Sequence, residues 1–194
     1  MALPNYKSPL YSKQGLWSLF NICAFPPHFW TLLLAFRDIS WLTERSNLWD
    51  AIGVVSYGLV FAFAESLIVF ILSALLGLLI STKWEEARRI ALLSTLMFIL
   101  SLWAMYGQAY FVWNMSPSDQ ILKLMAQSGH PYRIIFGITS IEVFLTVAVS
   151  TILVLRWDKF FHFVQEAIDR ISLLTLLYLV LDLFGLVIVV IRNI

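Results

Sequence analysis

The chain has 194 residues, of which 60% are hydrophobic and 13% are charged. Soluble domains are roughly 45–50% apolar, so this composition excludes a free soluble globule. The net charge of +1, with no basic cluster longer than Arg88 and Arg89, excludes nucleic acid as a partner, because phosphate binding needs a concentrated field of Lys and Arg. The single cysteine, Cys23, excludes an intrachain disulfide and a thiolate metal site.

The first apolar segment, residues 16–36, follows Lys7 and Lys13 and contains Pro26 and Pro27. Proline removes a backbone donor and pushes the preceding residue out of the helical region, so neither half of the segment clearly spans a bilayer alone. The segment therefore predicts either a proline-kinked span or an interfacial helix. We expect it to be retained, because no small-residue cleavage site follows it.

The central apolar segment, residues 51–80, contains a single charged residue, Glu65. A helix of this length would be roughly 45 Å long against roughly 30 Å of bilayer hydrocarbon, which places Glu65 near the midplane. Asn47 followed three residues later by Asp50 is typical of a helix N-cap. We therefore predict a span over about residues 48–82.

Three more apolar runs predict further spans, at residues 90–113, 134–155 and 171–191. Each is long enough to satisfy its own backbone hydrogen bonds in lipid as a helix. The predicted fold is all-α: one polytopic helical membrane bundle with four transmembrane helices, plus residues 16–36 as a fifth or interfacial segment.

Two connectors predict short surface amphipathic helices. In the first, Ser116 can cap the helix, Pro117 suits its first position and Gly129 supplies the stop. In the second, residues 157–170, apolar side chains recur at helical spacing with polar ones on the other faces, as in a helix that lies at the membrane surface. Residues 28–42, which contain Arg37 but are rich in aromatic side chains, also suit the headgroup level.

The distribution of Lys and Arg predicts an orientation only if residues 16–36 span. Eight basic residues then lie on one side and five on the other, which places the N-terminus in the cytoplasm. If that segment does not span, the count becomes six against seven and the bias disappears. Tryptophans fall at the predicted ends of spans, as in an aromatic belt: Trp49, Trp84, Trp113 and Trp157.

Three acids lie inside predicted spans: Glu65, Glu142 and Asp182. Each belongs to a stripe of small or polar residues at helical spacing, and a fourth stripe lies on residues 90–113, so we expect a bundle with these stripes turned inward. The stripes comprise Gly58, Ala62, Glu65, Val69, Ser73 and Gly77; Ser94, Ser101 and Gln108; Thr139, Glu142, Thr146 and Ser150; and Ser172, Thr175, Tyr178, Asp182 and Gly185.

No Lys, Arg or His lies within the four predicted spans, so the sequence predicts carboxylates with no cationic partner in this chain. Each must then be protonated, solvated in a cavity, matched by a bound cation or met by a basic residue of another subunit. The proton, cation or polar-seam candidates are Glu65, Glu142, Asp182, Gln108 and Tyr178. The alternative is that these groups are neutral and join helices by hydrogen bonds.

No motif indicates a catalytic residue, a metal site or a cofactor. His28, His130 and His162 lie near predicted membrane boundaries on different segments, which does not favour a haem held by two histidines. The leading hypothesis is a non-enzymatic accessory or scaffold subunit that packs in the lipid bilayer with other membrane subunits or with itself.

The second hypothesis is a small transporter or channel whose intramembrane acids bind a proton or cation near the midplane. A membrane-embedded enzyme acting on lipid comes third, without a candidate catalytic residue. Acids that converge on one water-accessible cavity favour transport, whereas dry and separate pairs favour the scaffold.

Overall fold

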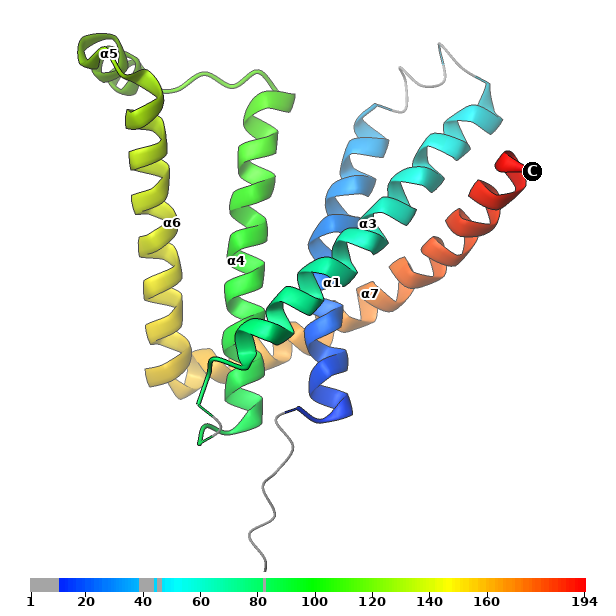
Figure 1. Cartoon of the computed structure of the whole chain (residues 1–194), viewed down its shortest axis with the longest axis horizontal. Helices are drawn as coiled ribbons and strands as arrows, with labels where there is room; N and C mark the ends of the chain where they lie inside the picture. Colours follow the sequence, from blue (N-terminus) through cyan, green and yellow to red (C-terminus); the bar gives the residue numbers. More distant parts are fainter. Residues whose placement is uncertain (1–10, 39–43, 45–46, 82) are drawn as a thin grey trace, which may run out of the picture.

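The computed structural model of the chain describes residues 11–38, 44, 47–81 and 83–194, and its elements are helices (Figure 1). They are α1 (Lys13–Arg37), α3 (Leu48–Gly77), α4 (Glu86–Val112), α5 (Asp119–Ser128), α6 (Pro131–Arg156) and α7 (Asp158–Asn193). All except α5 are long and apolar enough to cross a membrane, which makes five candidate spans. The predicted all-α membrane bundle is confirmed, and residues 16–36 lie within a helix of full spanning length.

Helix α1 continues through Pro26 and Pro27 without a break. It begins after Ser12, whose side chain accepts a hydrogen bond from the backbone N–H of Gly15 at 3.0 Å. Residues 28–37, which were predicted as a separate headgroup-level element, complete this helix, while residues 39–43 lie outside the described part of the chain. Helices α3, α4 and α7 pack against α1, and this tertiary packing outweighs the loss of the two proline donors.

The start of α3 is confirmed. The Asn47 side chain accepts a hydrogen bond from the backbone N–H of Asp50 at 2.9 Å, as an N-cap residue does. The helix ends at Gly77, so residues 78–81 belong to the connector toward α4 rather than to the predicted span, and residue 82 lies outside the described residues.

The short surface helix α5 begins two residues later than predicted. Ser118 occupies the N-cap position and Asp119 is the first helical residue, so Ser116 and Pro117 precede the helix. Gly129 ends it in the left-handed conformation (φ 66°), where glycine costs least. The predicted stop is therefore confirmed and the predicted start is wrong.

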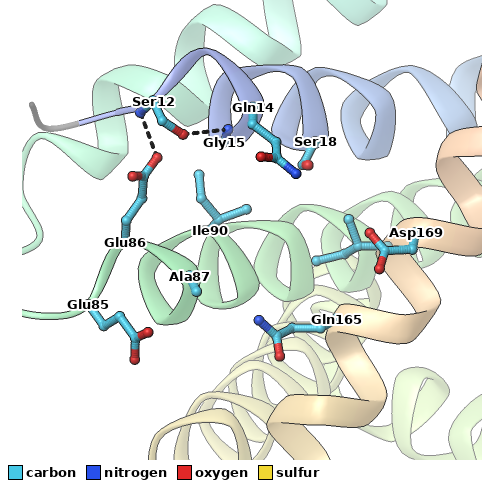
Figure 2. Close-up of a pocket in the computed structure, with 11 residues that line it drawn as sticks. Ser12, Gln14, Gly15, Ser18, Glu85, Glu86, Ala87, Ile90, Gln165 and Asp169 are labelled. Atoms are coloured by element: carbon cyan, nitrogen blue, oxygen red, sulfur yellow. Dashed lines mark hydrogen bonds between the residues drawn. The ribbon is translucent and has the colours of Figure 1, made fainter.

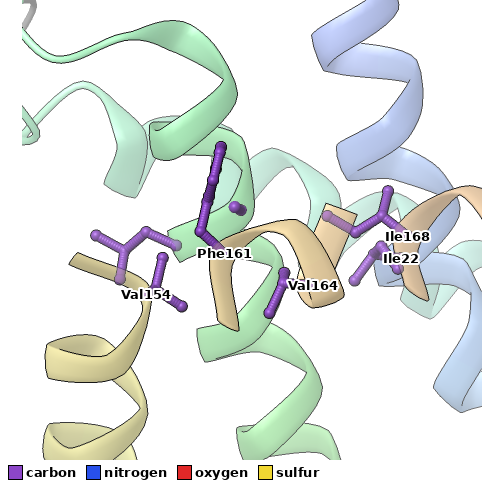
Figure 3. Packing of buried hydrophobic residues seen from close by; sticks show 7 residues of the cluster. Ile22, Val154, Phe161, Val164 and Ile168 are labelled. Atoms are coloured by element: carbon purple, nitrogen blue, oxygen red, sulfur yellow. The ribbon is translucent and has the colours of Figure 1, made fainter. Parts of the chain in front are cut away.

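The predicted interfacial helix at residues 157–170 is the first part of α7, which runs without interruption to Asn193. Its apolar residues Phe161, Val164 and Ile168 are buried in a cluster with residues of α1, α4 and α6 (Figure 3). The full cluster is Ile22, Ala91, Leu92, Val154, Phe161, Val164 and Ile168. The apolar face exists as predicted, and it packs against the protein core.

The five candidate spans run alternately in opposite directions, so α1 and α7 point the same way (Figure 1). Ion pairs join helix ends at both ends of the molecule. Arg88 donates to Asp158 at 2.7 Å beside the corner between α6 and α7. At the opposite end Arg192 donates to Asp50 at 2.7 Å, which ties the last turn of α7 to the first turn of α3.

Helix α6 is the least covered of the five candidate spans. Only 6% of its most apolar 18-residue window is buried, against 44% for α1. Figure 1 shows α6 on the outer side of α4, away from α1 and α3. The core therefore lies among α1, α3, α4 and α7, and α6 presents most of its surface to its surroundings.

Candidate functional site

His28 of α1 and Asp182 of α7 form a buried pair. The Nε2 atom of His28 lies 2.8 Å from Oδ2 and 3.0 Å from Oδ1 of Asp182. His28 is 0% exposed and Asp182 is 8% exposed. The prediction that the intramembrane acids have no basic partner in this chain is therefore wrong for Asp182. The prediction that His28 is a boundary residue is wrong too, because α1 places it in the interior.

The hydrogen bonds of His28 determine how many protons the pair holds. Its Nδ1 atom lies 2.7 Å from the carbonyl oxygen of Ala24, which can only accept, so Nδ1 carries a proton. The contact between Nε2 and the Asp182 carboxyl group then needs one proton of its own, held on either residue. Both arrangements give a pair with zero net charge. This neutrality explains how a carboxyl group is accommodated inside the bundle without a Lys or Arg.

A second contact between the same helices fixes their register. The hydroxyl of Thr175 donates to the carbonyl oxygen of Asn21 at 2.9 Å. Thr175 and Asn21 lie seven residues before Asp182 and His28, and both contacts join residues 154 positions apart. Seven residues are about two helical turns, so α1 and α7 lie parallel with one face of each in contact.

Tyr178 lies on the same face of α7, between these two contacts in the sequence. Its ring stacks on His28 with centroids 5.7 Å apart and an interplanar angle of 8°, and on Phe25 at 6.0 Å. Tyr178 is also buried, so it covers the imidazole with an aromatic face. We call the contact surface of Asn21, His28, Thr175, Tyr178 and Asp182 the α1–α7 seam.

The amide of Asn21 has no hydrogen-bond partner among the described residues, although the residue is 0% exposed. The hydroxyl of Ser94 on α4 is also buried without a hydrogen bond among the described residues. A buried polar group left unsatisfied costs about 1–3 kcal/mol. The seam thus contains one amide, that of Asn21, whose donor and acceptor atoms are not used by the seam contacts.

Two glycines let α3 approach its neighbours closely. A Cβ atom at Gly185 of α7 would lie 3.3 Å from the carbonyl oxygen of Ser56, and one at Gly58 would lie 3.0 Å from Thr31 of α1. Ser73 of α3 faces α1, with its hydroxyl 3.4 Å from the thiol of Cys23. The predicted inward orientation of the stripe is therefore confirmed for most of α3.

Glu65 departs from this pattern. It lies near the middle of α3 but at the edge of the stripe, and its side chain is exposed. Among the described residues it makes no hydrogen bond or ion pair. The spacing predicted the face of the helix correctly, but a carboxylate at the edge of that face points out of the bundle.

The stripe on α6 is exposed and borders an open groove beside α4, which contradicts the prediction that it lines the bundle interior. Thr139, Glu142 and Thr146 are all exposed, because α6 packs mainly on one helix, α4. Glu142 borders a groove of about 540 Å³ between α4 and α6. The groove is lined by Ile99, Leu102, Trp103, Tyr106, Glu142, Thr146 and Ser150, and we call it the α4–α6 groove.

The candidate site residues predicted from the sequence thus lie in separate parts of the structure. Asp182 and Tyr178 lie together in the seam, whereas Glu65 and Glu142 are exposed on α3 and α6. Gln108 is exposed near the end of α4. The three acids do not line one cavity. Sequence reasoning missed His28; the available signal was that Asn21 and His28 lie seven residues apart within the apolar run 16–36, the same spacing as Thr175 and Asp182.

A further cavity, of about 570 Å³, lies where the first turns of α1 and α4 meet α7 (Figure 2). Glu85, Glu86 and Asp169 contribute carboxylates to it, and Glu86 accepts a hydrogen bond from the backbone N–H of Ser12 at 2.6 Å. Among the described residues, no group of three or more His, Cys, Asp and Glu side chains is arranged to hold a metal ion.

No known protein family, curated protein or solved structure compared with this chain matches it.

Proposed function

We propose that this protein is an accessory or scaffold subunit that packs with other proteins inside a membrane. The observation that carries the proposal is the separation of the intramembrane acids. Asp182 is buried against His28 in the seam, while Glu65 and Glu142 are exposed on different helices. A transport site built from all three acids would need them to share a water-accessible cavity.

The exposure of Glu65 and Glu142 supports contact with a partner protein rather than with lipid alone. Lipid tails can cover the apolar side chains of α6 as well as a protein can, but they offer nothing to a carboxylate. A second protein can supply a hydrogen-bond donor or a cation at that depth. The glycines agree with this reading, since Gly58 and Gly185 face neighbouring helices, whereas a Cβ at Gly137 on α6 would meet nothing within 4 Å.

We also propose that the N-terminus lies in the cytoplasm. Five spans leave eight Lys and Arg residues on the N-terminal side and five on the other. Positively charged loops favour the cytoplasmic side. A protease-accessible tag at each end of the chain, assayed in sealed membrane vesicles of known orientation, tests this orientation.

The proposed function is tested by the mass of the assembly. The tagged protein is extracted from its native membrane in a mild detergent and compared on a native gel with the same chain produced alone. The proposal expects one discrete assembly heavier than the detergent complex of the isolated 22.3 kDa chain. Identical migration of the two samples would contradict it.

Transport remains the second candidate, because the seam holds a proton between His28 and Asp182 and also contains the unpaired amide of Asn21, about two helical turns away along α1. Purified protein in proteoliposomes tests it directly. The scaffold proposal expects no pH-driven or cation-driven flux. Flux that Asp182→Asn abolishes, in a variant that elutes and unfolds like the parent, would favour transport instead.

A further inference from the structure

We infer that the α4–α6 groove binds a transmembrane helix of a different protein, and that this helix carries a basic side chain opposite Glu142. The inference rests on the proposed function and names the surface and chemistry of the partner. Glu142 lies near the middle of α6, so the basic group is needed at the depth of the bilayer core.

The polar groups of the groove leave Glu142 without a donor. Trp103 donates its indole N–H to the hydroxyl of Thr146 at 3.0 Å. That hydroxyl donates in turn to carbonyl oxygens of its own helix, those of Glu142 and Val143, at 2.9 Å each. These two donors are thereby used within the groove wall, and the hydroxyls of Tyr106 and Ser150, which also line the groove, donate no hydrogen bond to Glu142. The Glu142 carboxylate makes no hydrogen bond or ion pair with the described residues.

The rest of the groove suits an apolar helix with one polar position. Ile99, Leu102 and Tyr106 form one wall, and Leu102 and Tyr106 are 46% and 54% exposed. These side chains offer apolar contact along α4, while Glu142 offers a single charge on α6. A helix that is apolar except for one Lys or Arg is complementary to this arrangement in both charge and polarity.

A second copy of this chain does not offer that cation. Within the candidate spans, Lys and Arg lie near the ends of α1, α4 and α6 or outside the apolar core of α7: Lys13, Arg37, Arg88, Arg89, Arg133, Arg156, Lys159, Arg170 and Arg192. His28 is at mid-depth, but it is fully buried and bonded to Asp182. The partner helix therefore belongs to another protein.

An ion pair between Glu142 and the basic side chain lowers the free energy of both helices in the membrane. A Lys or Arg at the centre of a membrane helix is costly to insert, and a carboxylate there is similarly unfavourable. Bringing the two together neutralises each of them. The same reasoning predicts that a helix with an acidic residue at that position is rejected.

The test uses three synthetic transmembrane peptides of about 20 residues, rich in Leu and Ala, which differ only in a central Lys, Leu or Glu. Each peptide carries an acceptor dye and is reconstituted with the full chain bearing a donor dye at its C-terminus. Energy transfer then measures binding. The inference expects the Lys peptide to bind best, with a loss of roughly five- to thirtyfold in Glu142→Gln.

Glu65→Gln is the matched control, because Glu65 is the other exposed intramembrane glutamate but lies outside the groove. It should leave binding of the Lys peptide unchanged. Equal binding of the Lys and Leu peptides, or Lys-peptide binding that survives Glu142→Gln, overturns the inference. A discrete native assembly combined with either of those results would leave the scaffold proposal standing, whereas absence of the native assembly removes the scaffold proposal itself.

Discussion

His28 and Asp182 occupy equivalent positions on two parallel helices. Each lies seven residues after a second contact between α1 and α7, the hydrogen bond from Thr175 to the carbonyl oxygen of Asn21. The first and last spans of the chain are thus joined in one register by two polar contacts. The ring of Tyr178 covers the histidine between them.

Removing one member of the pair should cost more than removing both. His28→Leu leaves a buried carboxyl group without its partner, and Asp182→Leu leaves a buried imidazole, at about 3–5 kcal/mol each. The double variant His28→Leu/Asp182→Leu leaves no unpaired group and should lie closer to the parent than the sum of the single variants. Unfolding free energies measured in mixed micelles test this prediction, and additive losses would contradict it.

Asn21→Leu should preserve or raise the unfolding free energy. The amide of Asn21 is buried without a hydrogen bond, and Leu has a similar volume without the polar atoms. The backbone carbonyl that accepts from Thr175 is unaffected. The expected change is a gain of up to about 1–3 kcal/mol in the same unfolding assay. A clear loss would show that the amide is satisfied in the folded protein.

Gly185→Leu should destabilise the bundle by about 1–3 kcal/mol, because a side chain there meets the backbone of Ser56 on α3. Gly107→Leu is the matched control, since a Cβ at Gly107 would meet nothing within 4 Å. Thermal unfolding in detergent compares the two. Similar effects at both positions would argue against the close contact between α3 and α7.

Tyr11 should make stability depend on pH at the alkaline end. Its hydroxyl donates to the carbonyl oxygen of Ala74 at 3.0 Å, and burial raises its pKa while the charge of Arg89 opposes that rise. A raised pKa in the folded state means that the contribution is complete below the ordinary value of about 10 and is lost as pH rises through the raised value. The stability difference between the parent and Tyr11→Phe should be constant from about pH 7 to 9 and shrink above about pH 10. A difference that is unchanged above that pH would contradict the assignment.

The sequence predicted the features that depend on local periodicity. Apolar runs located the spans, the pairing of Asn47 with Asp50 located the start of α3, and Gly129 located the end of α5. Each of these features depends only on residues that are close together in the sequence, so a single segment is enough to recognise it. The apolar face of residues 157–170 was visible for the same reason.

Local periodicity did not predict the features that depend on which helices pack against each other. Pro26 and Pro27 leave open whether residues 16–36 span, and the sequence alone places His28 near a membrane boundary, so it does not reveal the partner of Asp182. The stripe on α6 has the same spacing as the one on α7, yet one faces outward and the other lines the seam. Helical spacing shows which residues share a face, but only the packing of the helices shows where that face points.

The most direct test of the scaffold account places a photoreactive phenylalanine analogue in the chain within its native membrane. At position 106 the probe replaces Tyr106 in the α4–α6 groove, and at position 184 it replaces Phe184 of α7, which is 61% exposed against 54% for Tyr106. The account predicts a discrete protein adduct from position 106 that Glu142→Gln removes, and only lipid adducts from position 184. Lipid adducts alone from both positions would contradict it.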